Sequence, residues 1–133
     1  MATETLTMAK ALTLGLAAAM EADDKVILMG EDIGPLGGVF RVTEGLQQQF
    51  GAHRVLDTPL AESGIVGAAI GLAMRGYRPV VEIQFDGFIF PAFDQITTQL
   101  AKLTARHEGA LQMPVVIRVP YGGHIGAVEH HQE

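Results

Sequence analysis

The sequence contains no cysteine and no tryptophan, only 2 tyrosines, and few basic residues. The lack of cysteine excludes a disulfide framework, a thiolate metal site and a cysteine nucleophile. The 9 lysines and arginines are outnumbered by 15 aspartates and glutamates, and the net charge of -6 argues against a general nucleic-acid-binding surface. No G-x-S-x-G motif occurs, so a serine hydrolase of that type has no basis in this sequence.

A targeting segment and a membrane span are also missing from the pattern. The first apolar stretch follows Thr3, Glu4 and Thr5, where a signal peptide carries positive charge. The same stretch is too short and too rich in alanine to span a membrane. The sequence therefore predicts a cytoplasmic protein in which this stretch is a packed amphipathic helix.

The apolar content, by contrast, is high. Hydrophobic residues make up 48% of the 133 positions, and the mean hydropathy is +0.26. A chain of this length forms one domain with its own core. The apolar excess suggests strands that are buried on both faces, or a surface reserved for a partner chain.

Short apolar runs alternate with stretches of helical periodicity. The runs predict strands within residues 25–30, 54–59, 78–85 and 113–120. Helices are expected at 5–22, 61–74 and 91–107, the last with Pro91 in its first turn. A short helix is also expected between Thr43, a candidate N-cap, and Gly51, a candidate stop. The alternation predicts an α/β fold, with a parallel sheet and helices on both faces. Ligands of such sheets gather at the loops after the carboxyl ends of the strands.

One of these loops leads into DTPLAESGIVGAAIGLAMRG, where Glu62 is the single carboxylate at the start of an apolar helix. Gly64, Gly67 and Gly71 share one helix face, and each glycine costs roughly 1 kcal/mol against alanine. Close approach of another backbone or of a flat ligand is the usual compensation. A buried Glu62 would suit proton transfer near neutral pH. The alternative is a solvated acid that only stabilises the first turn of the helix.

Three other loop stretches are less specific. GEDIGPLGGVF lacks the Walker lysine and the full dinucleotide fingerprint, which favours a structural loop. EIQFDGFIFPAFDQ places Glu82 and Gln84 on one face of a strand, and its phenylalanines are typical of a core, with a partner interface as the alternative. YGGHIGAVEHHQE contains His124, His130 and His131, for which a loop-borne proton donor is favoured over a metal site.

Three stretches of the chain together carry a resemblance to a known family: GEDIGPLGGVFRVTEGL, FGAHRVLDTPLAESGIVGAAIGLAMRGYRPVVEIQF and FIFPAFDQI. They resemble the β subunit of the thiamine-diphosphate-dependent 2-oxo acid dehydrogenases. The resemblance covers essentially all of residues 1–133. It implies a transketolase-like pyrimidine-binding domain, incomplete (truncated) at its C-terminus and without the family's C-terminal domain. It also implies an α2β2 enzyme in which thiamine diphosphate lies between unlike subunits, with magnesium held mainly by the alpha subunit.

The resemblance further implies roles for individual residues. Glu62 matches the acid of the family's TPL-x-E-x-G motif, which hydrogen-bonds the aminopyrimidine ring and provides the proton that activates the cofactor. Gln84 and Phe88 match positions on the pyrimidine side, and Glu31 matches the acid of the GED motif near the cofactor. His131 matches a catalytic histidine that faces the substrate and lipoyl channel, although this chain reads HHQE where the family has a serine.

The implied reaction is the oxidative decarboxylation of a 2-oxo acid, with the acyl group passed to lipoamide on the lipoyl acyltransferase of the complex. FIFPAFDQI favours a branched-chain substrate, and pyruvate is the alternative. The isolated 133-residue piece is expected to be inactive. Two other hypotheses are a non-catalytic interaction module and a transketolase-like synthase. No metal ligand, nucleic-acid partner or membrane partner is expected of this chain.

Overall fold

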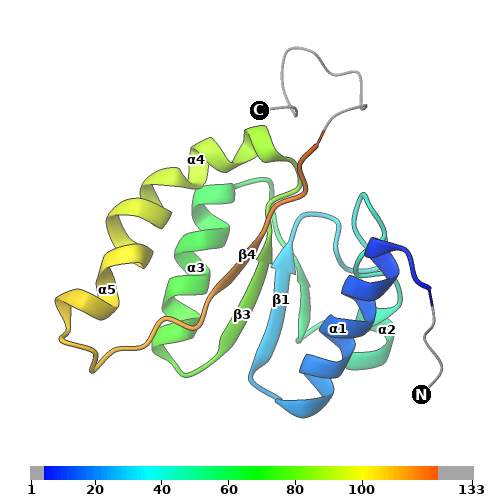
Figure 1. Ribbon diagram of the computed structural model, residues 1–133, viewed down its shortest axis with the longest axis horizontal. Helices are drawn as coiled ribbons and strands as arrows, with labels where there is room; N and C mark the ends of the chain where they lie inside the picture. Colours follow the sequence, from blue (N-terminus) through cyan, green and yellow to red (C-terminus); the bar gives the residue numbers. More distant parts are fainter. Residues whose placement is uncertain (1–4, 123–133) are drawn as a thin grey trace.

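A computed structural model describes residues 5–122 of the chain. Four parallel strands form one sheet in the order β2-β1-β3-β4 (Figure 1). Their bounds are β1 Val26–Gly30, β2 Val55–Asp57, β3 Arg78–Glu82 and β4 Val116–Arg118. Each strand lies within one of the four apolar runs, which confirms the predicted α/β fold with a parallel sheet.

The helices also follow the predicted order. The first three are α1 Met8–Ala22, α2 Leu46–Phe50 and α3 Glu62–Met74. A final series follows β3 and consists of η1 Asp86–Phe88, α4 Ile89–Asp94, the π-helical turns η2 Gln95–Leu100, and α5 Ala101–Arg106. The helix that begins with α4 at Ile89 has Pro91 in its first turn and runs to Arg106, which confirms the helix predicted at roughly 91–107. The π segment in its middle was not predicted. Between residues 5 and 122, no helix has both the length and the apolar character needed to cross a membrane.

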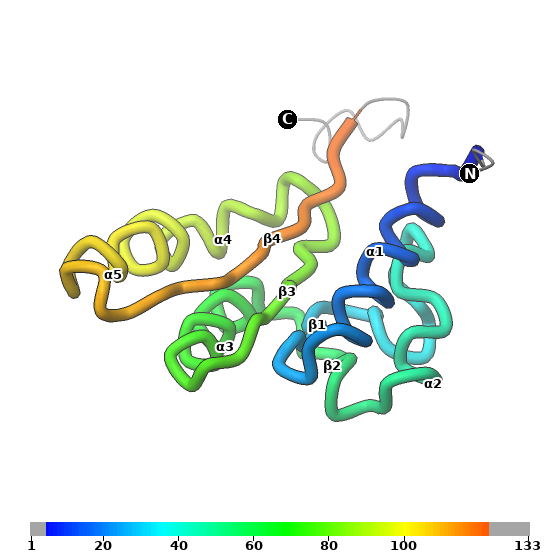
Figure 2. Tube along the Cα trace, turned by 60° about the horizontal axis from the view of Figure 1, so that its bottom comes forward, coloured from blue at the N-terminus to red at the C-terminus, as the bar shows by residue number. Residues whose placement is uncertain are grey.

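Helices cover both faces of the sheet, as Figures 1 and 2 show from two directions. On one face, Met20 of α1 and Leu46 of α2 pack against Val26 and Leu28 of β1. On the other face, α3 packs against β1 and β3, and its far side contacts α4 and α5. The strands are therefore buried on both sides, which accounts for their unbroken apolar sequences.

The segment before α2 differs from the prediction. Thr43 is not an N-cap, because α2 begins at Leu46 after Gly45, which adopts a left-handed φ of 79°. The buried hydroxyl of Thr43 instead donates a 2.8 Å hydrogen bond to the carbonyl oxygen of Ile33. This bond ties the two ends of the long loop after β1 together. Gly51 ends the helix as predicted.

Arg54 joins the ends of three elements. Its Nη2 donates to the carbonyl oxygens of Met20, Asp23 and Val26 at 3.0, 2.8 and 2.9 Å. These carbonyls lie at the end of α1, at its C-cap and at the start of β1, while Arg54 directly precedes β2. One guanidinium therefore holds the edge of the sheet that lies opposite the strands' carboxyl ends.

The strand order also determines where the chain leaves the sheet. From β1 the chain continues to α2 on one face, and from the neighbouring β3 it continues to α4 on the other. Where adjacent strands of a doubly wound sheet diverge in this way, their carboxyl ends are the expected place for a ligand.

Candidate functional site

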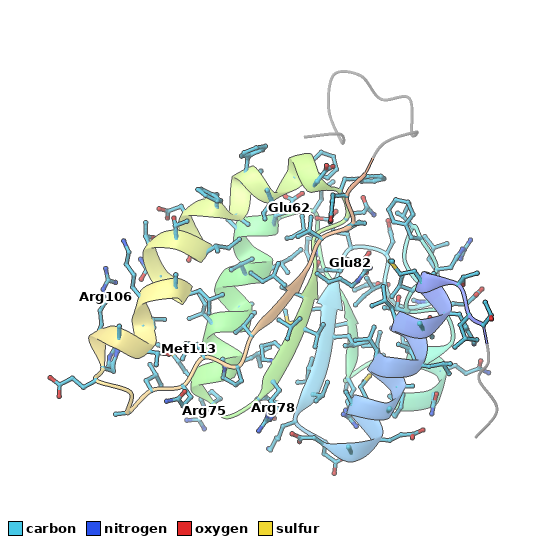
Figure 3. All side chains as sticks on the ribbon, in the orientation of Figure 1. Glu62, Arg75, Arg78, Glu82, Arg106 and Met113 are labelled. Carbon is cyan, nitrogen blue, oxygen red and sulfur yellow. The ribbon has the colours of Figure 1, made fainter. Side chains whose placement is uncertain are left out.

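Glu62 is the first residue of α3, at the carboxyl edge of the sheet (Figure 3). Its side chain is buried, with an exposed fraction of 6%. The N-cap residue, Ala61, makes no side-chain hydrogen bond to the first turn of α3. The N-cap position therefore places no neutral capping side chain beside the carboxyl of Glu62. Glu62 is therefore not a solvated acid in this structure.

Glu31 comes directly after β1 and is as buried as Glu62. Burial is the main cause that raises the pKa of Glu31 above its usual value, and the negative charges of Glu62 and Asp32 add to it. Hydrogen bonding from the backbone of Ala61 acts in the opposite direction. The Oε1 atom of Glu31 has no hydrogen-bond partner among the described residues. The site thus holds two interacting acids, of which Glu31 gains its proton more readily than an ordinary glutamate.

Gln84 and Asp32 connect the two diverging loops. The Nε2 atom of Gln84, two residues after β3, donates a 3.2 Å hydrogen bond to Oδ2 of Asp32, two residues after β1. Asp32 adopts a left-handed φ of 58°, which is uncommon outside glycine and asparagine-like residues. This bond crosses the point where the chain leaves β1 and β3 in opposite directions, so it lies where the topology favours a ligand.

Phe88 belongs to a short series of aromatic contacts beside Gln84. Its ring meets the ring of Phe85 edge to face at 5.9 Å and 90°, and Phe85 meets Phe40 at 5.6 Å and 70°. Phe85 and Phe88 are half-buried, whereas Phe90 and Phe93 on α4 are 63% and 52% exposed. The interpretation of all four as core is therefore wrong for the last two, which are available to a partner.

Sequence reasoning missed two charged groups at this edge. Half-buried Arg118 of β4 forms an ion pair with the buried Glu82 of β3, whereas the sequence pattern indicates only that Glu82 and Gln84 share a strand face. Asp86 is 9% exposed and its Oδ2 has no hydrogen-bond partner in the part of the chain that the structure describes. The available signal for Glu82 and Arg118 was that charged residues in the strands of a buried sheet require partners, whereas Asp86 lies in η1 and gave no such signal.

The glycines of α3 make little contact within the chain. A Cβ added at Gly64 would lie 3.5 Å from Ala61, one at Gly67 would lie 3.9 Å from Gln95, and one at Gly71 would meet nothing within 4 Å. No close backbone approach therefore uses this face between residues 5 and 122. Close packing against another subunit stays a prediction.

The predicted site residues are thus partly assembled. Glu31 and Glu62 lie together, and Gln84 and Phe88 follow the neighbouring strand β3. His131, with His124 and His130, lies outside the described residues. The arrangement combines carboxyl, amide and aromatic groups, which suits a flat ring with a polar edge and the movement of a proton.

Comparison with known sequences gives this geometry a context. Residues 4–133 match the family described as transketolase, pyrimidine binding domain. The chain is 75% identical over 130 residues to the pyruvate dehydrogenase E1 component subunit beta of Leifsonia xyli subsp. xyli (strain CTCB07), covering 98% of this chain and 39% of that protein. It is 56% identical over 131 residues to the 3-methyl-2-oxobutanoate dehydrogenase subunit beta of Mycobacterium tuberculosis (strain ATCC 25618 / H37Rv), covering 98% of this chain and 38% of that protein. The chain therefore spans less than half the length of these relatives.

Proposed function

Because the chain belongs to the family of transketolase pyrimidine-binding domains, we propose that it forms the pyrimidine side of a thiamine-diphosphate site in the β subunit of a 2-oxo acid dehydrogenase. The observation that carries this proposal is the burial of Glu62 beside Glu31 at the first turn of α3. A buried acid at this edge is the group that a proton-transfer role requires. The match to the family supports the same role for the site as a whole.

The described residues fit the pyrimidine ring of thiamine diphosphate. The carboxyl of Glu62 and the amide of Gln84 offer hydrogen bonds to the polar edge of such a ring, and half-buried Phe88 offers an apolar surface. The buried Oε1 of Glu31 supplies a further acceptor. When bound, the cofactor would supply the electron sink for decarboxylation.

This chain's own contribution is to bind, orient and exchange a proton. In the proposal, the carboxyl of Glu62 exchanges a proton with the ring at a position shielded from water, and Glu31 lies beside it. Gln84 and Phe88 orient the ring from the β3 side. His131 acts on the substrate side, as the family resemblance implies, and magnesium is held mainly by the alpha subunit.

The reaction we propose is oxidative decarboxylation of a 2-oxo acid with transfer of the acyl group to lipoamide. The more similar of the two relatives described above is named for pyruvate, and the other for 3-methyl-2-oxobutanoate. We therefore place pyruvate ahead of the branched-chain acid that the sequence pattern favoured. The partners are an alpha subunit, in an α2β2 enzyme, and the lipoyl acyltransferase of the complex.

The test is reconstitution of the β subunit that contains this chain with its cognate alpha subunit. Release of carbon dioxide is measured from pyruvate and from 3-methyl-2-oxobutanoate, with thiamine diphosphate and magnesium present or omitted. The proposal expects cofactor-dependent release from at least one of the two acids. Assembly with the alpha subunit but no decarboxylation of either acid would overturn it and favour a non-catalytic interaction module.

A further inference from the structure

A partly buried ion pair joins the ends of β3 and β4 beside the site. Glu82 and Arg118 are direct partners in the register of these strands, and Nη2 of Arg118 donates to Oε2 of Glu82. Their side chains are 5% and 17% exposed. Neither residue has a part in the proposed function above, so the role of the pair needs a separate explanation.

Stability alone is a poor explanation for this pair. Removing two charges from water costs about as much as their attraction returns, and apolar residues of similar volume often stabilise a fold equally well. Oε1 of Glu82 has no hydrogen-bond partner between residues 5 and 122, and a cavity of about 10 Å³ adjoins the pair. The pair therefore adds little to the free energy of unfolding, because the cost of removing its charges from water offsets their attraction. It does fix the direction of both side chains.

Glu82 lies directly under the loop that carries the site acids. A Cβ added at Gly38 would lie 3.6 Å from Oε1 of Glu82, so this loop passes close to the carboxylate. The same loop begins with Glu31 and Asp32. Asp32 accepts the hydrogen bond from Gln84, two residues beyond Glu82 on the same chain segment. The ion pair thus lies beside both chain segments that the Asp32–Gln84 hydrogen bond joins.

We propose that Arg118 is a positioning residue for Gln84. Through Glu82 it fixes the end of β3 against the loop after β1, and so keeps the amide of Gln84 oriented by Asp32. In this proposal Arg118 acts through Glu82. That Gln84 serves a cofactor rests on the proposed function, whereas the ordering of the loop does not.

The first experiment measures this ordering without reference to activity. Hydrogen–deuterium exchange is followed in the complete β subunit for the wild type, Arg118→Met, Arg118→Lys and Arg75→Met. Arg75 is an exposed arginine at the opposite edge of the sheet and is the matched control (Figure 3). We expect Arg118→Met to speed exchange at residues 31–38 and 82–85 by about tenfold or more, as loss of a charge-assisted contact predicts. Arg118→Lys restores most of the protection, and Arg75→Met leaves both segments unchanged.

The second experiment measures binding of thiamine diphosphate, with magnesium, to the assembled enzyme. Arg118→Met is expected to weaken binding by about tenfold, and to change the KM for the cofactor more than kcat. A merely structural role would lower the melting temperature and the yield but leave the affinity of the folded enzyme unchanged. If Arg118→Met does not fold, Glu82→Gln is measured in the same way, because it removes the charge from the other side of the pair.

The outcomes separate the two proposals. Faster exchange in both segments with no cofactor binding in any form, wild type included, contradicts the proposed function and retains the positioning role. Normal cofactor binding in the wild type, together with unchanged exchange and unchanged affinity in Arg118→Met, overturns the positioning role.

Discussion

Glu31 and Glu62 lie buried at the carboxyl edge of the sheet, close enough for the charge of Glu62 to raise the pKa of Glu31. The two residues come from different parts of the fold, one following β1 and the other starting α3. Bringing two acids together out of water opposes folding. The fold therefore assembles this pair at a cost in stability, which is typical of functional sites.

The first prediction concerns the pH dependence of stability. Because the folded-state pKa of Glu31 lies above its ordinary value of 4.5, the folded state binds the proton more strongly than the unfolded state. Stability therefore falls as the pH rises from 4.5 through the raised pKa, and stays lower above it. Glu31→Gln should remove this loss, so the variant is more stable than the wild type near neutral pH and similar to it in acid.

The measurement is the urea midpoint as a function of pH. Glu44→Gln, which changes an exposed glutamate, is the control and should show no such pH-dependent difference. An advantage of Glu31→Gln that grows towards acid pH would contradict the assignment.

Arg54 provides a second prediction. Arg54→Met leaves the carbonyls of Met20, Asp23 and Val26 without their common donor and should lower the free energy of unfolding by about 3 kcal/mol. Asp24→Asn is the control, because Asp24 meets Arg54 at 3.4 Å but is 98% exposed, and should change stability by less than about 0.5 kcal/mol. Denaturant unfolding measures both. Equal losses would mean that the surface ion pair, and not the carbonyl contacts, matters.

The loop after β1 provides a third prediction. Gly37 has a φ of 82°, and an added Cβ would lie 2.6 Å from the Cα of Glu44. Gly37→Ala should therefore destabilise the protein by about 2 kcal/mol or more. Gly15→Ala is the matched change in open space within α1 and should stabilise by about 0.5–1 kcal/mol. Urea unfolding checks the prediction: the midpoint should fall for Gly37→Ala and rise for Gly15→Ala, relative to the wild type. An unchanged midpoint for Gly37→Ala would show that the loop rearranges freely.

The glycine face of α3 provides a fourth prediction. An added Cβ at Gly71 meets nothing within 4 Å, so Gly71→Ala should stabilise the β subunit alone by up to about 1 kcal/mol. If this face packs closely against another subunit, the same change weakens assembly. Sedimentation of the mixture with the alpha subunit measures this, with Gly15→Ala as the control. Unchanged assembly would reject the close-packing hypothesis.

The sequence predicted the strands and their parallel arrangement well, because these depend on the local apolar pattern and on the alternation of strands with helices. The runs around β1 and β3 are bounded by turn residues and buried on both faces, so their identity is hardly affected by distant contacts. Glu62 was found for a similar reason, since a single acid at the start of an apolar helix is visible without a fold.

Other features depend on contacts that the sequence does not reveal. Thr43 precedes a helix and has a capping side chain, yet the folded loop brings it to the carbonyl of Ile33 instead. The pairing of Glu82 with Arg118 requires the register of β3 and β4, which lie 36 residues apart in sequence. The exposure of Phe90 follows from how α4 packs on α3, and aromatic content alone does not determine it.

The most direct test of the central claim compares Glu62→Gln with Glu44→Gln in the reconstituted enzyme. Glu62→Gln keeps the size and burial of the side chain but removes the acidic proton. We predict that it assembles with the alpha subunit, binds thiamine diphosphate with magnesium, and loses decarboxylation by at least about 100-fold, while Glu44→Gln retains wild-type turnover. Wild-type turnover by Glu62→Gln would contradict the account.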